Sequence, residues 1–152
     1  MTGIQVLNYL KSLFERELTS FIDEFKKIPE DKLWQTTGTI ANSGAVLAKH
    51  ITGNLNHFFG HVLGGNNYIR DKEKEFNPQA DKSRDELVAD LETCPALVKR
   101  VIPSITEEEL SRPFPVEVYG GMNTFEFLLH LHYHLSYHLG QLNYLRRALS
   151  SL

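Results

Sequence analysis

The seven histidines of this chain are its most chemically suggestive residues, and they fall in two clusters. The first cluster consists of His50, His57 and His61, and the second of His130, His132, His134 and His138. Imidazole nitrogens bind divalent transition metals and exchange protons near neutral pH. The two clusters therefore indicate a metal site, a proton-transfer site or a polar layer of hydrogen-bonded histidines.

The spacing of the second cluster favours a metal site. His134 and His138 are four residues apart, so on a helix their rings lie one turn apart and can reach the same ion. A third ligand must come from another helix. His50 and His57 are two turns apart, about 10.5 Å along a helix axis, so they cannot both bind that ion. Three neutral imidazoles would leave one coordination position open, which is typical of a catalytic site.

Both clusters are expected at the edge of a core-facing helical surface. At about 100° per residue, His57 and His61 fall within roughly 20° of His50 on a helical wheel. Three histidines of the second cluster share a helical face in the same way: His130, His134 and His138. We therefore expect helices over about residues 44–63 and 124–148, with their histidine-bearing surfaces toward each other.

Helical periodicity also continues outside the histidine clusters. Apolar residues recur at three- and four-residue steps over about residues 4–27, and a third helix opens at Ser83 and holds Pro95, where a kink or a break is expected. The charged run 70–75 is expected to form a solvated loop or helix end, and 112–121 a loop or short extended piece. The prediction is an all-α four-helix bundle in one domain, residues 1–152, with connections long enough for a crossover topology.

Composition and charge argue against several classes of partner. Hydrophobic residues make up 41% and charged residues 23%, as in a soluble globular protein. The formal net charge of -3 provides no strong basic field, so no nucleic-acid partner is expected. We find no signal peptide and no apolar run near the ~20 residues of a membrane span, so we expect a cytoplasmic protein without a membrane partner. The single cysteine, Cys94, is interpreted as a buried, inert thiol.

Several segments resemble the DinB superfamily. The segment 48–55, AKHITGNL, is similar to the second helix of that superfamily, in which a histidine binds metal. The segment 134–141, HLSYHLGQ, resembles its HxxxHxGQ ending. Residues 68–71 and 75–76 are similar to one uncharacterised subgroup. Since the order of helices and the chain length also agree, the resemblance covers nearly the whole chain.

The resemblance implies a four-helix bundle, a homodimer and a three-histidine site for one divalent transition metal. It assigns the metal ligands to His50, His134 and His138. Zinc or nickel is expected at such a site, and iron, copper and manganese stay open. Characterised DinB-like proteins include transferases that use low-molecular-weight thiols such as bacillithiol or mycothiol, and a mycothiol-dependent isomerase. No thiol-cofactor signature is present in this sequence.

Together these observations predict a metal-dependent enzyme that acts on a small-molecule substrate. The ion would lower the pKa of a bound thiol or water, which gives thiol S-transfer or hydrolysis. We favour transfer of a low-molecular-weight thiol by analogy with the superfamily. His57 or His61 is predicted to act as a catalytic general base. The alternatives are a non-enzymatic metal- or small-molecule-binding bundle and a structural bundle whose histidines only form hydrogen bonds.

Overall fold

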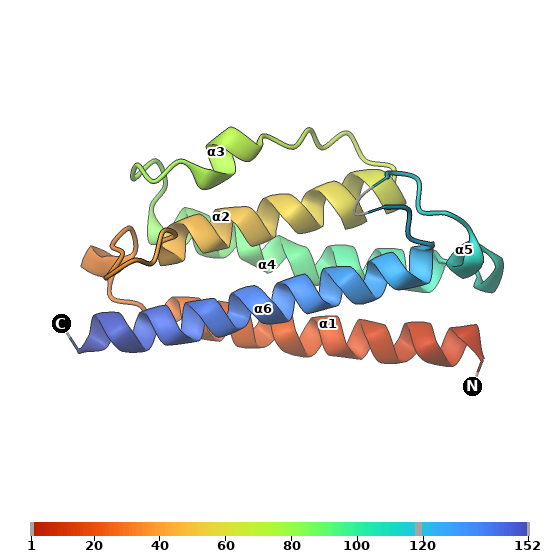
Figure 1. Ribbon diagram of the computed structural model, residues 1–152, viewed down its shortest axis with the longest axis horizontal. Helices are drawn as coiled ribbons and strands as arrows, with labels where there is room; N and C mark the ends of the chain where they lie inside the picture. Colours follow the sequence, from red (N-terminus) through yellow and green to blue (C-terminus); the bar gives the residue numbers. More distant parts are fainter. Residues whose placement is uncertain (1, 118–119, 152) are drawn as a thin grey trace.

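Four long helices make up the computed structural model of this protein, which describes residues 2–117 and 120–151 (Figure 1). They are α1 (Gly3–Lys26), α2 (Gly44–Leu55) with its π-helical continuation η2 (Asn56–Leu63), α4 (Arg84–Val101) and α6 (Thr124–Ser150). Short helices lie in the connections: η1 (Glu30–Lys32), α3 (Lys72–Phe76), η3 (Ile102–Ser104) and α5 (Glu107–Ser111). The predicted all-α four-helix bundle is confirmed.

The connection between α2 and α4 is a crossover. Helix α1 packs on α4 and α6, and α2 packs on the same two helices, so α1 and α2 lie diagonally across the bundle. Residues 64–83 return along the bundle before α4 begins, and α2 and α4 therefore run in the same direction (Figure 1). The short helix α3 lies in this returning segment and packs on α2. The crossover that the connection lengths allow is thus present, and it brings α3 against α2.

The helix boundaries follow from capping interactions. Thr2, Ser83 and Asn123 each form a capping box with the residue three positions later, at the start of α1, α4 and α6. Gly65 adopts a φ of 68° just after η2, which ends that helix where the sequence predicts. Pro95 lies inside α4, which continues past it. The break that was one predicted outcome at this proline is therefore wrong.

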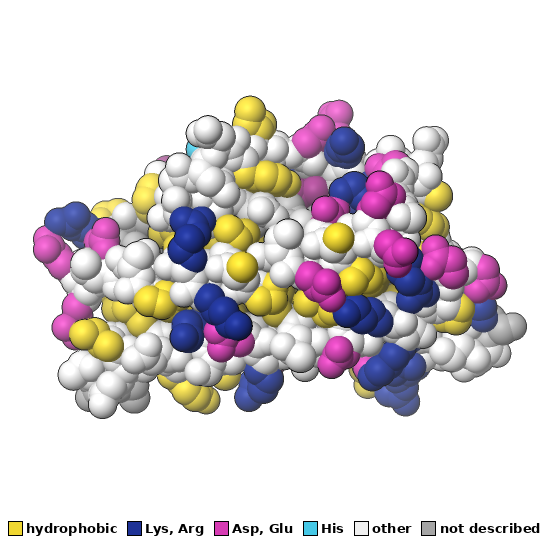
Figure 2. All heavy atoms as spheres, turned by 180° about the vertical axis from the view of Figure 1, so that it is seen from behind, with side chains coloured by type: hydrophobic (Ala, Val, Ile, Leu, Met, Phe, Trp, Pro, Cys, Tyr) yellow, Lys and Arg dark blue, Asp and Glu magenta, His cyan; other side chains and the backbone are white. Residues whose placement is uncertain are grey.

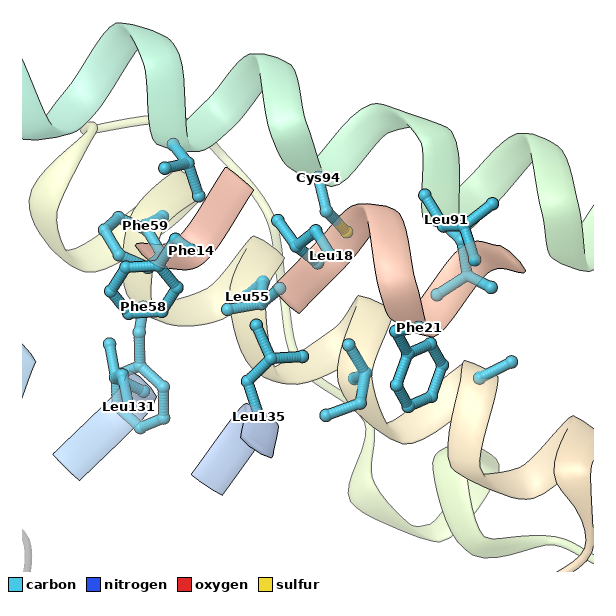
Figure 3. Packing of buried hydrophobic residues seen from close by; sticks show 14 of the residues in the cluster. Phe14, Leu18, Phe21, Leu55, Phe58, Phe59, Leu91, Cys94, Leu131 and Leu135 are labelled. Carbon is cyan, nitrogen blue, oxygen red and sulfur yellow. The ribbon is translucent and has the colours of Figure 1, made fainter. Parts of the chain in front are cut away.

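Apolar side chains from all four long helices meet in the bundle interior (Figure 3). Phe14 of α1, Leu55 of α2 and Leu135 of α6 are each at most 1% exposed. Burial of such side chains is the main driving force for folding, at about 25 cal/mol per Å² of apolar surface. Cys94 of α4 is also fully buried, and burial raises the pKa of its thiol to about 12. It is therefore an inert thiol at neutral pH, as predicted.

The surface carries charges of both signs. Basic and acidic side chains are interspersed on the face opposite to that of Figure 1, with hydrophobic side chains between them (Figure 2). Among residues 2–117 and 120–151, no helix combines the length and the apolar character that crossing a membrane requires. An isolated bridge joins Pro113 to Asn123 at the base of the predicted loop 112–121. Val118 and Tyr119 of that loop lie outside the described residues.

Candidate metal centre

Three histidine rings from α2 and α6 meet at one point beside the core. His50 Nε2 lies 3.0 Å from His134 Nε2, which lies 3.1 Å from His138 Nε2. The three candidate ligand atoms all lie within 4.8 Å of one another. A tetrahedral ion with metal–nitrogen bonds of about 2.05 Å would separate its ligand nitrogens by about 3.3 Å. Two of the three separations are close to this value and the third is no more than 4.8 Å, so the three rings converge as ligands of one ion would.

Neighbouring side chains fix the tautomers of two of these rings. His50 Nδ1 donates to Glu75 Oε2 at 3.2 Å, and His138 Nδ1 donates to Gln141 Oε1 at 2.7 Å. The single proton of each neutral ring is then on Nδ1, so both Nε2 atoms present lone pairs toward His134. His134 Nε2 carries at most one proton, and hydrogen bonding can therefore satisfy only one of the two close contacts. A cation among the three Nε2 atoms would satisfy both, and metal-binding histidines have this kind of outer support.

Glu75 of α3 supports the site from a buried position. Its side chain is 5% exposed and accepts from Arg70 Nε at 2.8 Å and Arg70 Nη2 at 2.9 Å. Burial alone would raise the pKa of Glu75, but hydrogen bonds from His50 and Arg70 outweigh burial and lower the pKa below its ordinary value. The ionised carboxylate keeps the proton of His50 on Nδ1. Gly53 permits this approach, because a Cβ there would lie 2.1 Å from Glu75 Oε1.

The two histidines of α6 are neutral at pH 7. Burial, followed by repulsion from His138 and His50, lowers the pKa of His134 to about 3. Burial, followed by repulsion from His50, lowers the pKa of His138 to about 4. Only a neutral imidazole can offer a lone pair to a metal, so both rings have the protonation state that a ligand needs.

A cavity of about 320 Å³ opens onto the three histidines. Its other lining residues are four apolar side chains, one amide, one further imidazole and two basic side chains. They are, in that order, Phe58, Phe76, Phe127 and Leu131, then Asn54, His130, and Arg70 and Lys72. A volume of this size lies at the lower end of the range of small-molecule sites, about 300–1,000 Å³. The cavity therefore has room for a small ligand next to the candidate metal position.

The structure separates the remaining histidines from the three-histidine cluster to different degrees. His130 lines the cavity, and its ring centroid is 6.5 Å from that of His134. His57 and His61 stack on each other with centroids 6.0 Å apart, and neither is among the lining residues. His132 packs edge-on against a phenylalanine of α1. The catalytic role of His57 and His61 stays a prediction, and neither ring contacts the cluster.

A change of helix type explains the position of His57 and His61. The prediction extended α-helical geometry over residues 44–63, but the backbone becomes π-helical from Asn56 onward. A π-helix closes its hydrogen bonds to the fifth residue instead of the fourth, so each residue turns by less than the 100° or so of an α-helix. The wheel positions expected for His57 and His61 relative to His50 therefore no longer hold, and the difference grows from His57 to His61.

Sequence reasoning missed the contribution of residues 70–75 to the site. This charged run was expected to be solvated, but the Arg70 side chain is 10% exposed and Glu75 is 5% exposed. The expectation is wrong for these two residues because each neutralises the other in a buried ion pair. The similarity of residues 68–71 and 75–76 to a DinB subgroup was the available signal, but it carried no information about contacts.

Comparisons with known proteins agree with this fold. Residues 2–151 match a family model described as "Protein of unknown function (DUF1572)". A DinB-like protein from Bacillus subtilis has a TM-score of 0.70 at 20% identity, over 93% of this chain and 92% of that chain. A conserved protein from Enterococcus faecalis has a TM-score of 0.70 at 15% identity, over 97% of this chain and 96% of that chain. A DinB-like protein from Bacillus cereus has a TM-score of 0.67 at 17% identity, over 88% of this chain and 86% of that chain. No curated protein matches the chain. The predicted DinB-like fold is confirmed.

Proposed function

The chain belongs to the DUF1572 family, and we propose that it binds one divalent transition-metal ion with His50, His134 and His138 and uses it on a small-molecule substrate. The observation that carries this proposal is the approach of His50 Nε2 and His138 Nε2 to His134 Nε2 at hydrogen-bond distance, with too few protons to satisfy both contacts. Three nitrogen ligands suit zinc or nickel, and the same donor set also accepts iron. Manganese prefers oxygen ligands and fits less well.

The geometry supports the use of a bound ion as a Lewis acid. A divalent ion lowers the pKa of a thiol or water at its fourth position. Glu75 and Gln141 orient two of the candidate ligand rings, so these rings would need little reorganisation to hold an ion. Phe58 and Phe127 line the adjoining cavity and give it an apolar wall.

We favour thiol transfer over hydrolysis because zinc binds soft thiolates well. In this reaction the sulfur of a low-molecular-weight thiol bonds to an electrophilic carbon, and the leaving group departs with the electron pair of the broken bond. The thiol proton must pass to a base. His130 lines the cavity whereas His57 and His61 do not, so we assign the proton acceptor to His130.

Metal content per chain tests the proposal. Wild-type protein without an affinity tag, loaded with zinc and desalted, should retain about one ion per chain. His134→Ala should lose the ion, because His134 lies between the other two rings. His61→Ala is the matched control, since its ring is exposed and outside the cavity, and it should retain the ion.

Thermal unfolding gives an independent measurement. Metal at 100 times its Kd stabilises the fold by about 2.7 kcal/mol. For a chain of this size the melting temperature should therefore be about 5–10 °C higher than in chelator. The proposal would be wrong if the wild-type chain retained no ion and melted at the same temperature with and without chelator. The alternative of a structural bundle whose histidines only form hydrogen bonds would then hold.

A further inference from the structure

The charged residues that line the cavity beside the three histidines are all basic. Arg70 and Lys72 reach it from the crossover segment, and no Asp or Glu is among its lining residues in the described part of the chain. Three neutral imidazoles would bring no negative charge to a bound ion, and Glu75, the carboxylate behind His50, is already paired with Arg70. Because much of the wall is apolar, the effective dielectric constant is low and attraction to an anion is strengthened.

Lys72 is the more accessible of the two cations. It is exposed, and within residues 2–117 and 120–151 its ammonium group forms no ion pair or hydrogen bond. Arg70 uses Nε and Nη2 to bind Glu75, and its guanidinium carbon lies 5.8 Å from the centre of the Phe58 ring. Its Nη1 takes no part in that pair and still has N–H donors to offer. An anion in the cavity can therefore interact with both side chains without breaking the Arg70–Glu75 pair.

The rest of the lining is suited to an apolar ligand body. Phe76 lies on the same short helix as Lys72, is 42% exposed, and has its ring centroid 4.7 Å from that of His50. Asn54 is 6% exposed, and its buried Oδ1 has no hydrogen-bond partner among the described residues. A buried acceptor without a donor is unfavourable by about 1–3 kcal/mol. A ligand with an N–H or O–H group would supply the missing donor.

From these features we infer that the substrate is a small carboxylic acid with an apolar, preferably aromatic, body. Its carboxylate faces Lys72 and Nη1 of Arg70. Its body packs against Phe58 and Phe76, and its reacting group faces the three histidines. This inference rests on the proposed metal site, because the ion anchors the reacting group while α3 binds the rest of the molecule.

Three thiol probes separate these contributions. The first, 2-benzyl-3-mercaptopropanoate, carries a thiol for the metal, an apolar ring and a carboxylate. Its primary amide lacks only the charge, and 3-mercaptopropanoate lacks only the ring. Calorimetric titration of cobalt-loaded protein measures each Kd, and the thiolate-to-cobalt absorption band reports contact with the metal separately. We expect the first probe to bind about tenfold more tightly than either of the others, equal to about 1.4 kcal/mol.

Lys72→Met and Lys74→Met form a matched pair of variants. Lys74 lies on the same helix and is also exposed, but it lines a different cavity. Lys72→Met should weaken binding of the benzyl acid about fivefold and binding of its amide less than twofold, a loss of the size expected for an exposed charge pair. Lys74→Met should change neither Kd. Added salt should weaken binding of the acid to wild type more than to Lys72→Met.

The outcomes distinguish the two levels of the proposal. If none of the thiols produces the absorption band, the open metal site itself is wrong. If the band forms but acid and amide bind wild type equally, the carboxylate inference is wrong while the metal site stands. Equal losses in Lys72→Met and Lys74→Met would also overturn the role of Lys72, because a general change in surface charge would then explain both.

Discussion

Gly53→Ala is expected to weaken the metal site without altering any ligand. Gly53 lies one turn after His50 on α2, and a Cβ there would lie 2.1 Å from Glu75 Oε1 and 2.6 Å from its Cδ. Ordinary contact with a Cβ begins at 3.4 Å, so the carboxylate would have to retreat by about 1.3 Å. Because the new methyl group projects from α2, it displaces the carboxylate from His50 as well. The hydrogen bond between them is already 3.2 Å long and would be lost.

The substitution changes two free energies in opposite directions. Alanine favours a helix interior over glycine by about 1 kcal/mol, whereas overpacking a well-filled site costs about 1–3 kcal/mol. The net change in the free energy of unfolding therefore lies between about zero and a loss of about 2 kcal/mol, and a value in this range does not test the reasoning. Loss of an outer partner of a metal-binding histidine lowers metal affinity about 10- to 100-fold, or about 1.4–2.7 kcal/mol. Metal affinity is the quantity that separates the hypotheses.

Competition with a chromophoric chelator measures the zinc Kd of the variant. Gly140→Ala is the matched control, because it also replaces a helical glycine, next to Gln141 on α6. Apart from its chain neighbours and the backbone of its own helix, no described residue places an atom within 4 Å of the added Cβ. It should retain wild-type affinity and gain up to about 1 kcal/mol of stability. A Gly53→Ala protein with wild-type zinc affinity would refute the role of Glu75 in positioning His50.

Two further predictions concern protonation. Burial lowers the pKa of His134 to about 3 and that of His138 to about 4, whereas an ordinary histidine has a pKa of 6.5, so between these values the unfolded chain binds more protons than the metal-free fold. The free energy of unfolding should thus fall as the pH drops from about 6.5 toward 4, and this fall should be shallower in His138→Gln. Denaturant titrations at several pH values measure this free energy. An equal dependence on pH in the two proteins would contradict the lowered pKa values. For Cys94, whose pKa burial raises to about 12, we expect no reaction with a disulfide reagent at about pH 8 until denaturant unfolds the chain. Rapid reaction of the native protein would show that the thiol is accessible.

The bundle and the paired ligands of α6 could be predicted because both depend on local helical geometry. Residues four apart share a face of any α-helix, wherever that helix lies in the fold. The spacing of His134 and His138 is therefore sufficient to place them together. His50 was different, because helical spacing alone did not choose between it and His57. The resemblance to the DinB superfamily made that choice. The structure places His50 with the pair on α6.

The supporting residues could not be predicted from periodicity. Glu75 belongs to a helix of five residues, whose place is set by its packing on α2 and not by any repeat in the sequence. Gly53 offered the one physical clue, since a glycine inside a helical pattern is unfavourable by about 1 kcal/mol and suggests a close neighbour. The shift to π-helix after Leu55 was equally hidden, because residues 56–63 keep an apolar pattern that fits an ordinary α-helix.

The short helix α3 joins the two halves of the proposed chemistry. Lys72, Glu75 and Phe76 are spaced at i, i+3 and i+4, so they share one face of the helix. Glu75 holds His50, a candidate metal ligand, while Lys72 and Phe76 line the cavity in which a substrate would bind. A ligand that draws α3 toward the cavity must therefore also change the hold of Glu75 on His50. Such coupling is reciprocal: the ion and the ligand must each change the affinity for the other by the same factor. In the proposed function the crossover would be a functional element, because a simple up-and-down connection would leave this face of α2 without α3.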